Sequence, residues 1–175
     1  MNFLKLKRTI VIDDYTLGDV FLDYGGGKVM KYHKVLSSVD FKQVLPEQYR
    51  DRFLVSGMEI FNNVPVHTDS RVKVGINFYI DPGEFETKFW RIKDDDPTLI
   101  YNVANQVQNG KVFRPEALEF VESFVAKPGD AYLLDISKPH SVVSSNPSYR
   151  FAFVVQTNDY TFDDVANMLV ETGYL

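Results

Sequence analysis

Three residues in the middle and later parts of the chain have the types and spacing of a metal-binding site. His67 and Asp69 are separated by a single residue, and His140 follows a proline. In a β-strand, residues i and i+2 point to the same face, so the imidazole of His67 and the carboxylate of Asp69 converge on one point. The alternatives are a hydrogen-bonded surface pair for His67 and Asp69, and a surface or capping histidine for His140.

One cation interrupts the apolar segment near the C-terminus. Arg150 precedes the run Phe151–Val155. A guanidinium in such a strand needs an anion or an exposed face. By the two-residue period, Arg150 shares a face with Ala152, whose small side chain leaves room for a ligand. The alternative is an arginine paired with a structural carboxylate.

Together these residues are more specific than each one alone. Two imidazoles and one carboxylate form the facial triad that binds ferrous iron and leaves three coordination positions open. Those positions suit a bidentate 2-oxo acid and then O₂. A buried arginine such as Arg150 could hold the far carboxylate of that acid through a bidentate pair.

β-Strands are the elements that must position these side chains. Residues 71–81 alternate over ten positions, which is a strong strand signal. One face carries Val72, Val74, Ile76, Phe78 and Ile80, and the other carries Lys73, Gly75, Asn77 and Tyr79. Further strands are predicted at residues 9–12, 29–36, 88–92, 131–136 and 149–156.

Helices are fewer. A short helix is predicted at residues 46–53, after a proline, and a C-terminal helix at residues 161–170 with Thr161 as its N-cap. Residues 114–118 could open a helix or lead into a strand. Residues 25–27 form a glycine loop, and the acidic run 94–97 is expected to be a solvated loop. Many short strands with turn signals favour an antiparallel sandwich or barrel.

The composition is that of a globular domain. The chain has 175 residues with 45% hydrophobic residues, and neither a repeat nor a linker divides it, so residues 1–175 are expected to form one domain. The absence of cysteine excludes disulfides, thiolate catalysis and Cys zinc sites. The net charge of −5 argues against nucleic-acid binding. No apolar run is long enough to span a membrane, and a cytoplasmic location is expected.

The pattern of His67, Asp69, His140 and Arg150 resembles the H-x-D … H … R signature of the Fe(II)/2-oxoglutarate-dependent dioxygenases. The resemblance covers about residues 58–157. Three segments carry it further. Residues 126–135 resemble the Pro-Gly-Asp turn and strand before the distal histidine, residues 139–142 resemble its Pro-His-x-Val segment, and residues 76–82 resemble a strand of prolyl hydroxylases. Residues 134–143 are also similar to aspartyl/asparaginyl β-hydroxylases.

The resemblance implies a fold, a cofactor set and residue roles. The fold is mainly β, a double-stranded β-helix (a cupin-like jelly roll) with a few flanking helices. His67, Asp69 and His140 would bind Fe(II), and Arg150 would hold the cosubstrate 2-oxoglutarate. Many members have Ser or Thr two residues after this arginine, where this chain has Ala152. Tyr79, or Asn77 on the same strand face, could take over that role.

The implied activity is hydroxylation with O₂, with release of succinate and CO₂. A peptide, an amino acid or a small metabolite is the expected substrate class, and the oligomeric state stays open. One alternative is a cupin-like jelly roll that binds a metal without 2-oxoglutarate chemistry. Another is a catalytically silent binding or structural jelly roll. The third histidine, His33, is expected to be structural or exposed, or to line the substrate entrance.

Overall fold

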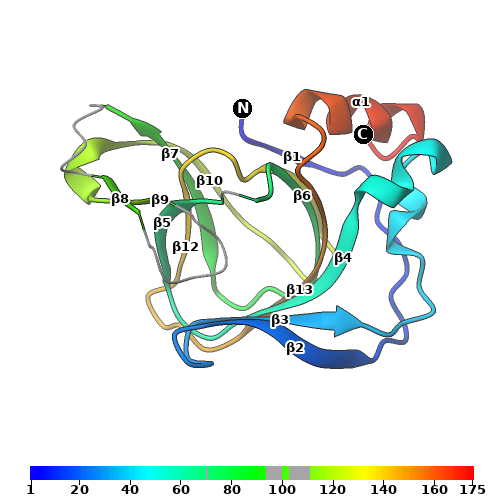
Figure 1. Ribbon diagram of the computed structural model, residues 1–175, viewed down its shortest axis with the longest axis horizontal. Coiled ribbons are helices and arrows are strands. Elements are labelled where there is room, and N and C mark those ends of the chain that lie inside the picture. Colours follow the sequence, from blue (N-terminus) through cyan, green and yellow to red (C-terminus); the bar gives the residue numbers. More distant parts are fainter. Residues whose placement is uncertain (70, 94–99, 103–110) are drawn as a thin grey trace.

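The computed structural model describes residues 1–69, 71–93, 100–102 and 111–175, and the chain within these ranges folds into two antiparallel sheets packed face to face (Figure 1). The acidic run 94–97 lies outside them. In order across the sheet, the strands of the first sheet are β1 (Phe3–Lys5), β11 (Ala131–Asp135), β6 (Val74–Asp81), β13 (Arg150–Thr157), β4 (Leu54–Ile60), β3 (Met30–Val35) and β2 (Leu17–Tyr24). Those of the second are β10 (Leu118–Val125), β7 (Glu86–Ile92), β12 (His140–Val143), β5 (Val64–Thr68), β9 (Lys111–Phe113) and β8 (Ile100–Asn102).

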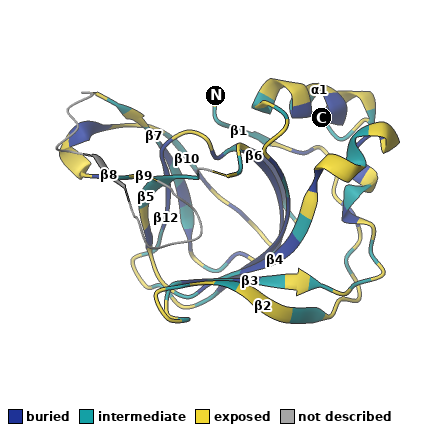
Figure 2. Ribbon diagram, viewed as in Figure 1, coloured by how far each residue is buried: buried dark blue, intermediate teal, exposed yellow. Residues whose placement is uncertain are grey.

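The central strands of the first sheet, β6 and β13, are buried on both faces, whereas β2 at its edge is largely exposed or half-buried (Figure 2). Along β6, Ile76 and Phe78 point to an outer cluster, whereas Asn77 and Tyr79 point between the sheets. This is the alternation that the sequence predicts. Because both faces of its central strands are covered, this sheet holds the side chains that point inward in fixed positions.

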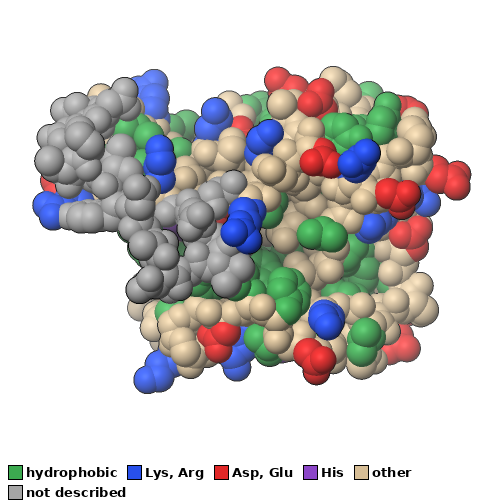
Figure 3. All heavy atoms as spheres, in the orientation of Figure 1, with side chains coloured by type: hydrophobic (Ala, Val, Ile, Leu, Met, Phe, Trp, Pro, Cys, Tyr) green, Lys and Arg blue, Asp and Glu red, His purple; other side chains and the backbone are tan. Residues whose placement is uncertain are grey.

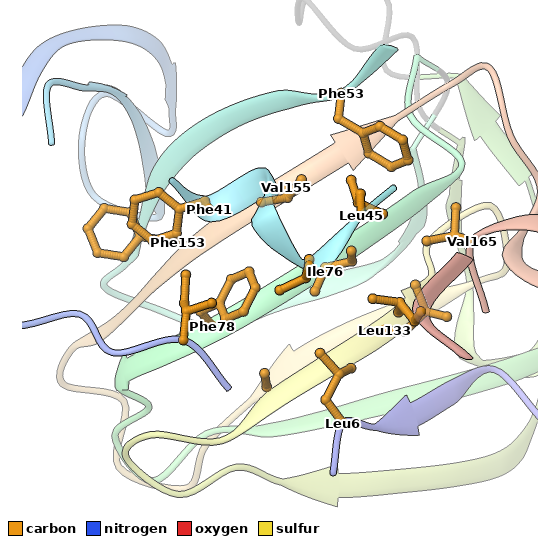
Figure 4. Packing of buried hydrophobic residues seen from close by; sticks show 14 of the residues in the cluster. Leu6, Phe41, Leu45, Phe53, Ile76, Phe78, Leu133, Phe153, Val155 and Val165 are labelled. Carbon is orange, nitrogen blue, oxygen red and sulfur yellow. The ribbon is translucent and has the colours of Figure 1, made fainter. Parts of the chain in front are cut away.

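The outer cluster is covered by the few helices and by the N-terminal segment (Figure 4). These are the 3₁₀ helices η1 (Phe41–Val44) and η2 (Glu47–Arg52) and the C-terminal helix α1 (Phe162–Glu171). The residues labelled in Figure 4 include Leu6, Phe41, Leu45, Phe153 and Val165. The space between the two sheets holds the second cluster and the candidate site.

Most of the predicted elements are present. The C-terminal helix is confirmed, and it begins with a capping box. The backbone N–H of Asp164 donates to the Thr161 hydroxyl oxygen, and the backbone N–H of Thr161 donates to the Asp164 carboxylate. The predicted helix at residues 46–53 is a 3₁₀ helix rather than an α-helix. The open choice at residues 114–118 resolves into both alternatives, because the 3₁₀ helix η4 (Pro115–Ala117) leads directly into β10.

The strand predicted at residues 9–12 is wrong. Ile10 is buried and Ile12 packs against the outer cluster, but this segment joins no sheet. The N-terminal strand is instead β1, which pairs with β11. Both isoleucines pack against apolar neighbours without pairing in a sheet, so apolar residues in this segment do not require a strand.

The glycine segment 25–27 is a tight turn that joins β2 to β3. All three glycines have positive φ, between 61° and 77°, which is the left-handed region that favours glycine.

The fold is therefore the mainly β jelly-roll sandwich that the sequence predicts. None of the helices in the described ranges combines the length and the apolar character needed to cross a membrane.

Candidate metal centre

Two neighbouring strands of the second sheet bring the histidines together. His67 lies in β5 and His140 begins β12, and the two residues are direct partners in the antiparallel register. Their ring centroids are 4.3 Å apart. Asp69 comes just after β5, and its Oδ1 lies 3.6 Å from Nε2 of His67. One ligand atom from each of the three residues lies within 4.8 Å of the others, which is the spacing of a site for one metal ion.

Backbone carbonyl groups fix the orientation of both imidazoles. Nδ1 of His67 lies 2.8 Å from the carbonyl oxygen of Pro65, and Nδ1 of His140 lies 2.9 Å from that of Lys138. In each ring Nδ1–H donates to the carbonyl, so Nε2 is the nitrogen available to a metal ion. Such a hydrogen bond to the second nitrogen is the usual way in which a protein orients a metal-binding histidine.

The protonation states suit a cation. Burial, together with the neighbouring His67, lowers the pKa of His140 to about 3. His140 is therefore neutral at pH 7, as a metal ligand must be. Burial raises the pKa of Asp69, while His67 opposes that shift. A carboxylate taken out of water in this way is stabilised by a bound cation.

Arg150 lies deeper between the sheets, and its exposed fraction is 1%. Its Nη2 donates to the Tyr79 hydroxyl at 2.7 Å and to Oγ1 of Thr87 at 3.0 Å. Its guanidinium carbon lies 4.7 Å from the centre of the Tyr79 ring. Nδ2 of Asn77 donates to the same Tyr79 hydroxyl, at 3.3 Å.

Two nitrogens of this guanidinium have no partner. Nε and Nη1 of Arg150 are buried and form no hydrogen bond to any described residue. Within the same ranges, no carboxylate forms an ion pair with Arg150. The structural carboxylate that was the alternative interpretation is therefore not found there. A buried, permanent cation without an anion is costly, so a ligand that brings an anion would be strongly favoured.

One pocket connects the metal ligands with the arginine. Its polar wall consists of Tyr32, His67, Asp69, Asn77, Thr87, His140, Arg150 and Gln156, and its remaining wall is apolar. Asn77 lines this pocket, whereas Tyr79 acts by contacting Arg150. The metal ligands lie toward the partly exposed end, since His67 and Asp69 keep 18% and 12% of their side-chain surfaces exposed.

Three residues near the site were not predicted from the sequence. Thr87 lies one residue before the predicted strand 88–92, and the observed strand β7 includes it. Its signal is that it shares a strand face with the buried Phe89. Tyr24 and Tyr32 are the other two, from β2 and β3. Burial and then the charge of Asp69 raise the pKa of both phenols, which places them near that carboxylate.

His33 does not join the site. It lies in β3 and alternates with Tyr32, which lines the pocket, so it points to the other face of the sheet. Its Nε2 lies 2.6 Å from Oε2 of Glu59, whose other oxygen accepts a hydrogen bond from Tyr149. The position agrees with a structural role and places His33 away from the substrate entrance.

Comparison with known proteins gives likeness of fold only. No family model matches the chain, and no curated protein matches it. Hazelnut (Corylus avellana) vicilin is 13% identical over 79% of the chain with a TM-score of 0.44, and the chain spans only 30% of it. Streptomyces albus HEPD, with 2-hydroxyethylphosphonate and Fe(II) bound, is 11% identical over 89% of the chain and 27% of its own length, with a TM-score of 0.42. A cupin-like protein from Thermotoga maritima is 10% identical over 85% of the chain and 83% of its own, with a TM-score of 0.38. At these identities and TM-scores, the likenesses carry no argument about function.

Proposed function

We propose that this chain is a non-haem Fe(II)- and 2-oxoglutarate-dependent oxygenase that hydroxylates a peptide, an amino acid or a small metabolite. The observation that carries the proposal is the guanidinium of Arg150, buried and without an anionic partner among the described residues, on the wall of the pocket that also holds His67, Asp69 and His140. A metal ion would account for three of these residues, and an anionic ligand in the same pocket would account for the fourth.

The donor set suits ferrous iron. Two imidazole nitrogens and one carboxylate would occupy one face of an octahedral ion and leave three positions for other ligands. The protein has no cysteine, so thiolate-selected metals are not favoured. Each imidazole has its Nδ1 fixed by a carbonyl and its Nε2 free, which is the state needed for binding.

The organic cosubstrate would be held at its far end by Arg150. Nε and Nη1 are the two donors without a partner among the described residues, and because their N–H groups diverge, a carboxylate can accept a charge-assisted hydrogen bond from one of them. The third nitrogen, Nη2, is already held by Tyr79 and Thr87, so the guanidinium plane is fixed before a ligand arrives. Thr87 lies opposite Val142 in the register and so belongs to the sheet that carries the histidines.

Bound Fe(II), with 2-oxoglutarate and O₂, supplies an oxidising chemistry in which one oxygen atom enters the substrate and the other enters succinate, with loss of CO₂. The residues of this chain prepare that reaction. Arg150 orients the cosubstrate, the two carbonyl contacts orient the imidazoles, and the apolar wall formed by Met30, Met58 and other residues keeps water away from the site.

A binding experiment under anaerobic conditions tests the proposal. Protein loaded with Fe(II) is titrated with 2-oxoglutarate and, as the matched control, with 2-oxopentanoate, which has the same chain length but lacks the far carboxylate. We expect the weak visible charge-transfer band of an iron–2-oxo acid complex, with a preference of about 100-fold or more for 2-oxoglutarate, as expected for a buried, hydrogen-bonded ion pair.

The variant Arg150→Ala should bind both acids equally and weakly, and it should keep its affinity for Fe(II). Absence of the band in the wild-type protein at saturating 2-oxoglutarate would overturn the proposal. If iron binds without any preference between the two acids, the chain is a metal-binding jelly roll of another chemistry. If iron itself does not bind, the silent jelly roll is the better description.

A further inference from the structure

The inner face of the first sheet has a second polar end, opposite to Arg150. Four residues form one row across four adjacent strands, because Arg150 pairs with Ile60, Ile60 with Met30, and Met30 with Tyr24. Three strand spacings separate Arg150 from Tyr24, about 14 Å along the sheet. The row therefore has a guanidinium at one end, a phenol at the other and two apolar side chains between them.

The hydroxyl group of Tyr24 is buried and forms no hydrogen bond to the described residues. The ring itself packs against the inner cluster. A buried hydroxyl without a partner costs free energy, and a phenol keeps its proton at neutral pH and can donate it to an acceptor. Tyr24 has no role in holding the cosubstrate, because Arg150 lies at the far end of the row.

A second tyrosine stands beside the first. Tyr32 lies in β3, two residues after Met30, and lines the pocket. Tyr32 and Asp69 line the same pocket, Tyr24 lies on the neighbouring strand β2, and the charge of Asp69 acts on both phenols. Whatever reacts at the metal is thus bordered by phenols on one side and by Arg150 on the other.

The pocket wall between Arg150 and the tyrosines is apolar and includes two methionines. Met30, Met58, Ile60 and Val154 line the pocket from the first sheet. In the view of Figure 3, hydrophobic side chains gather in the hollow between the two sheets, and the acidic side chains lie mainly around the periphery. Thioether side chains adapt to the shape of an apolar ligand.

We propose, building on the function proposed above, that Tyr24 is a substrate-binding residue and that the substrate is a mainly apolar organic molecule with a carboxylate or carbonyl oxygen. That oxygen accepts a hydrogen bond from the Tyr24 hydroxyl, beside Met30 and Tyr32, which line the β2–β3 end of the pocket. The apolar body lies over Met30 and Met58, next to the metal, while 2-oxoglutarate occupies the Arg150 end.

The test uses small probes and measures binding rather than turnover. Protein loaded with Mn(II) and saturated with 2-oxoglutarate is titrated by calorimetry with hexanoate and with hexylamine, which has a similar apolar chain but a cationic head. The variant Tyr24→Phe keeps the ring and removes only the hydroxyl. Tyr160→Phe is the matched control, because Tyr160 packs against the outer cluster on the other face of the first sheet.

We expect hexanoate to bind the wild-type protein and hexylamine to bind at least tenfold more weakly. Tyr24→Phe should weaken hexanoate about tenfold or more, the usual loss for one hydrogen bond to a charged acceptor. Tyr160→Phe should change nothing. Both variants should keep the wild-type affinities for Mn(II) and 2-oxoglutarate.

Equal binding of hexanoate by the wild-type protein and Tyr24→Phe would overturn the inference, as would equal binding of the two probes. A loss of Mn(II) affinity in Tyr24→Phe would also overturn it, because Tyr24 would then position Asp69 instead. If 2-oxoglutarate does not bind the wild-type protein, the proposed function fails. The hexanoate titration without it still decides whether the Tyr24 hydroxyl binds an acceptor.

Discussion

The substitution Arg150→Met tests whether the buried guanidinium stabilises the fold or instead serves to bind a ligand. The side chain is 1% exposed, and two of its three nitrogens have no partner among the described residues. Methionine fills a similar volume without the charge. The variant therefore removes the unpaired cation and leaves the packing between the sheets largely intact.

The expected change in stability follows from two opposing effects. Removing the charge ends a desolvation penalty of several kcal/mol. It also takes a donor away from the hydroxyls of Tyr79 and Thr87, which costs about 1–3 kcal/mol in total. The metal-free Arg150→Met variant should therefore be as stable as the wild-type protein, or up to about 3 kcal/mol more stable.

Urea unfolding measures this change, with fluorescence of the single tryptophan, Trp90, as the signal. The matched control is Arg52→Met, an exposed arginine whose loss should change the free energy of unfolding by about 0.5 kcal/mol or less. With Mn(II) saturating throughout, adding 2-oxoglutarate at 100 times its wild-type Kd should stabilise the wild-type protein by about 2.7 kcal/mol further, and Arg150→Met by about 0.5 kcal/mol or less.

Two results would refute this reasoning. One is a loss of more than about 3 kcal/mol in the metal-free Arg150→Met variant, because a loss of that size is typical of a broken structural ion pair. The other is an unchanged stabilisation by 2-oxoglutarate in the variant. Either result would make Arg150 a structural residue.

Three further predictions concern the metal centre and the fold. Asp69→Ala should weaken Mn(II) binding by more than about 100-fold in calorimetry, since even residues that only orient ligands contribute 10–100-fold, and an unchanged affinity would exclude Asp69 as a ligand. In the unfolded chain the imidazole of residue 140 is protonated below about pH 6.5, whereas in the folded protein buried His140 stays neutral down to about pH 3. The metal-free protein should therefore lose stability as the pH falls through this window. The loss is at most about 1.4 kcal/mol per pH unit, and urea unfolding of His140→Gln should show a flatter dependence; equal slopes would contradict the burial of a neutral imidazole. Gly83 has a φ of 56°, and an added Cβ would overlap the Tyr149 carbonyl oxygen, so Gly83→Ala should cost at least about 2 kcal/mol. Gly129 has a φ of 84° and open space around it, so Gly129→Ala should lower the free energy of unfolding by less. Equal urea midpoints for the two variants would count against the overlap at Gly83.

The grouping of the candidate metal ligands could be predicted because much of its information is local. His67 and Asp69 are two residues apart, and strand geometry alone places them on one face. His140 required the assumption that a second strand returns beside the first. The structure provides this return through the β5–β12 register.

The remainder of the site depends on long-range pairing. Thr87 reaches Arg150 across the sandwich, and Tyr24 enters only through the register of β2 with β3. Neither contact has a sequence signature, because the partners are far apart along the chain and each residue is also common on ordinary strands. The strand expected at residues 9–12 failed for a related reason, since apolar residues there are buried without a pairing edge.

The distribution of the site over the two layers has a mechanical consequence. The metal ligands belong to the second sheet and its β5 end, whereas Arg150 belongs to the first, and Thr87 is one direct hydrogen-bonded link between them at this depth. A dicarboxylate held at both places would act as a cross-tie between the layers. Its binding should make the sandwich as a whole more rigid. A small shift of one sheet relative to the other would misalign the reacting groups, although each half of the site would stay intact.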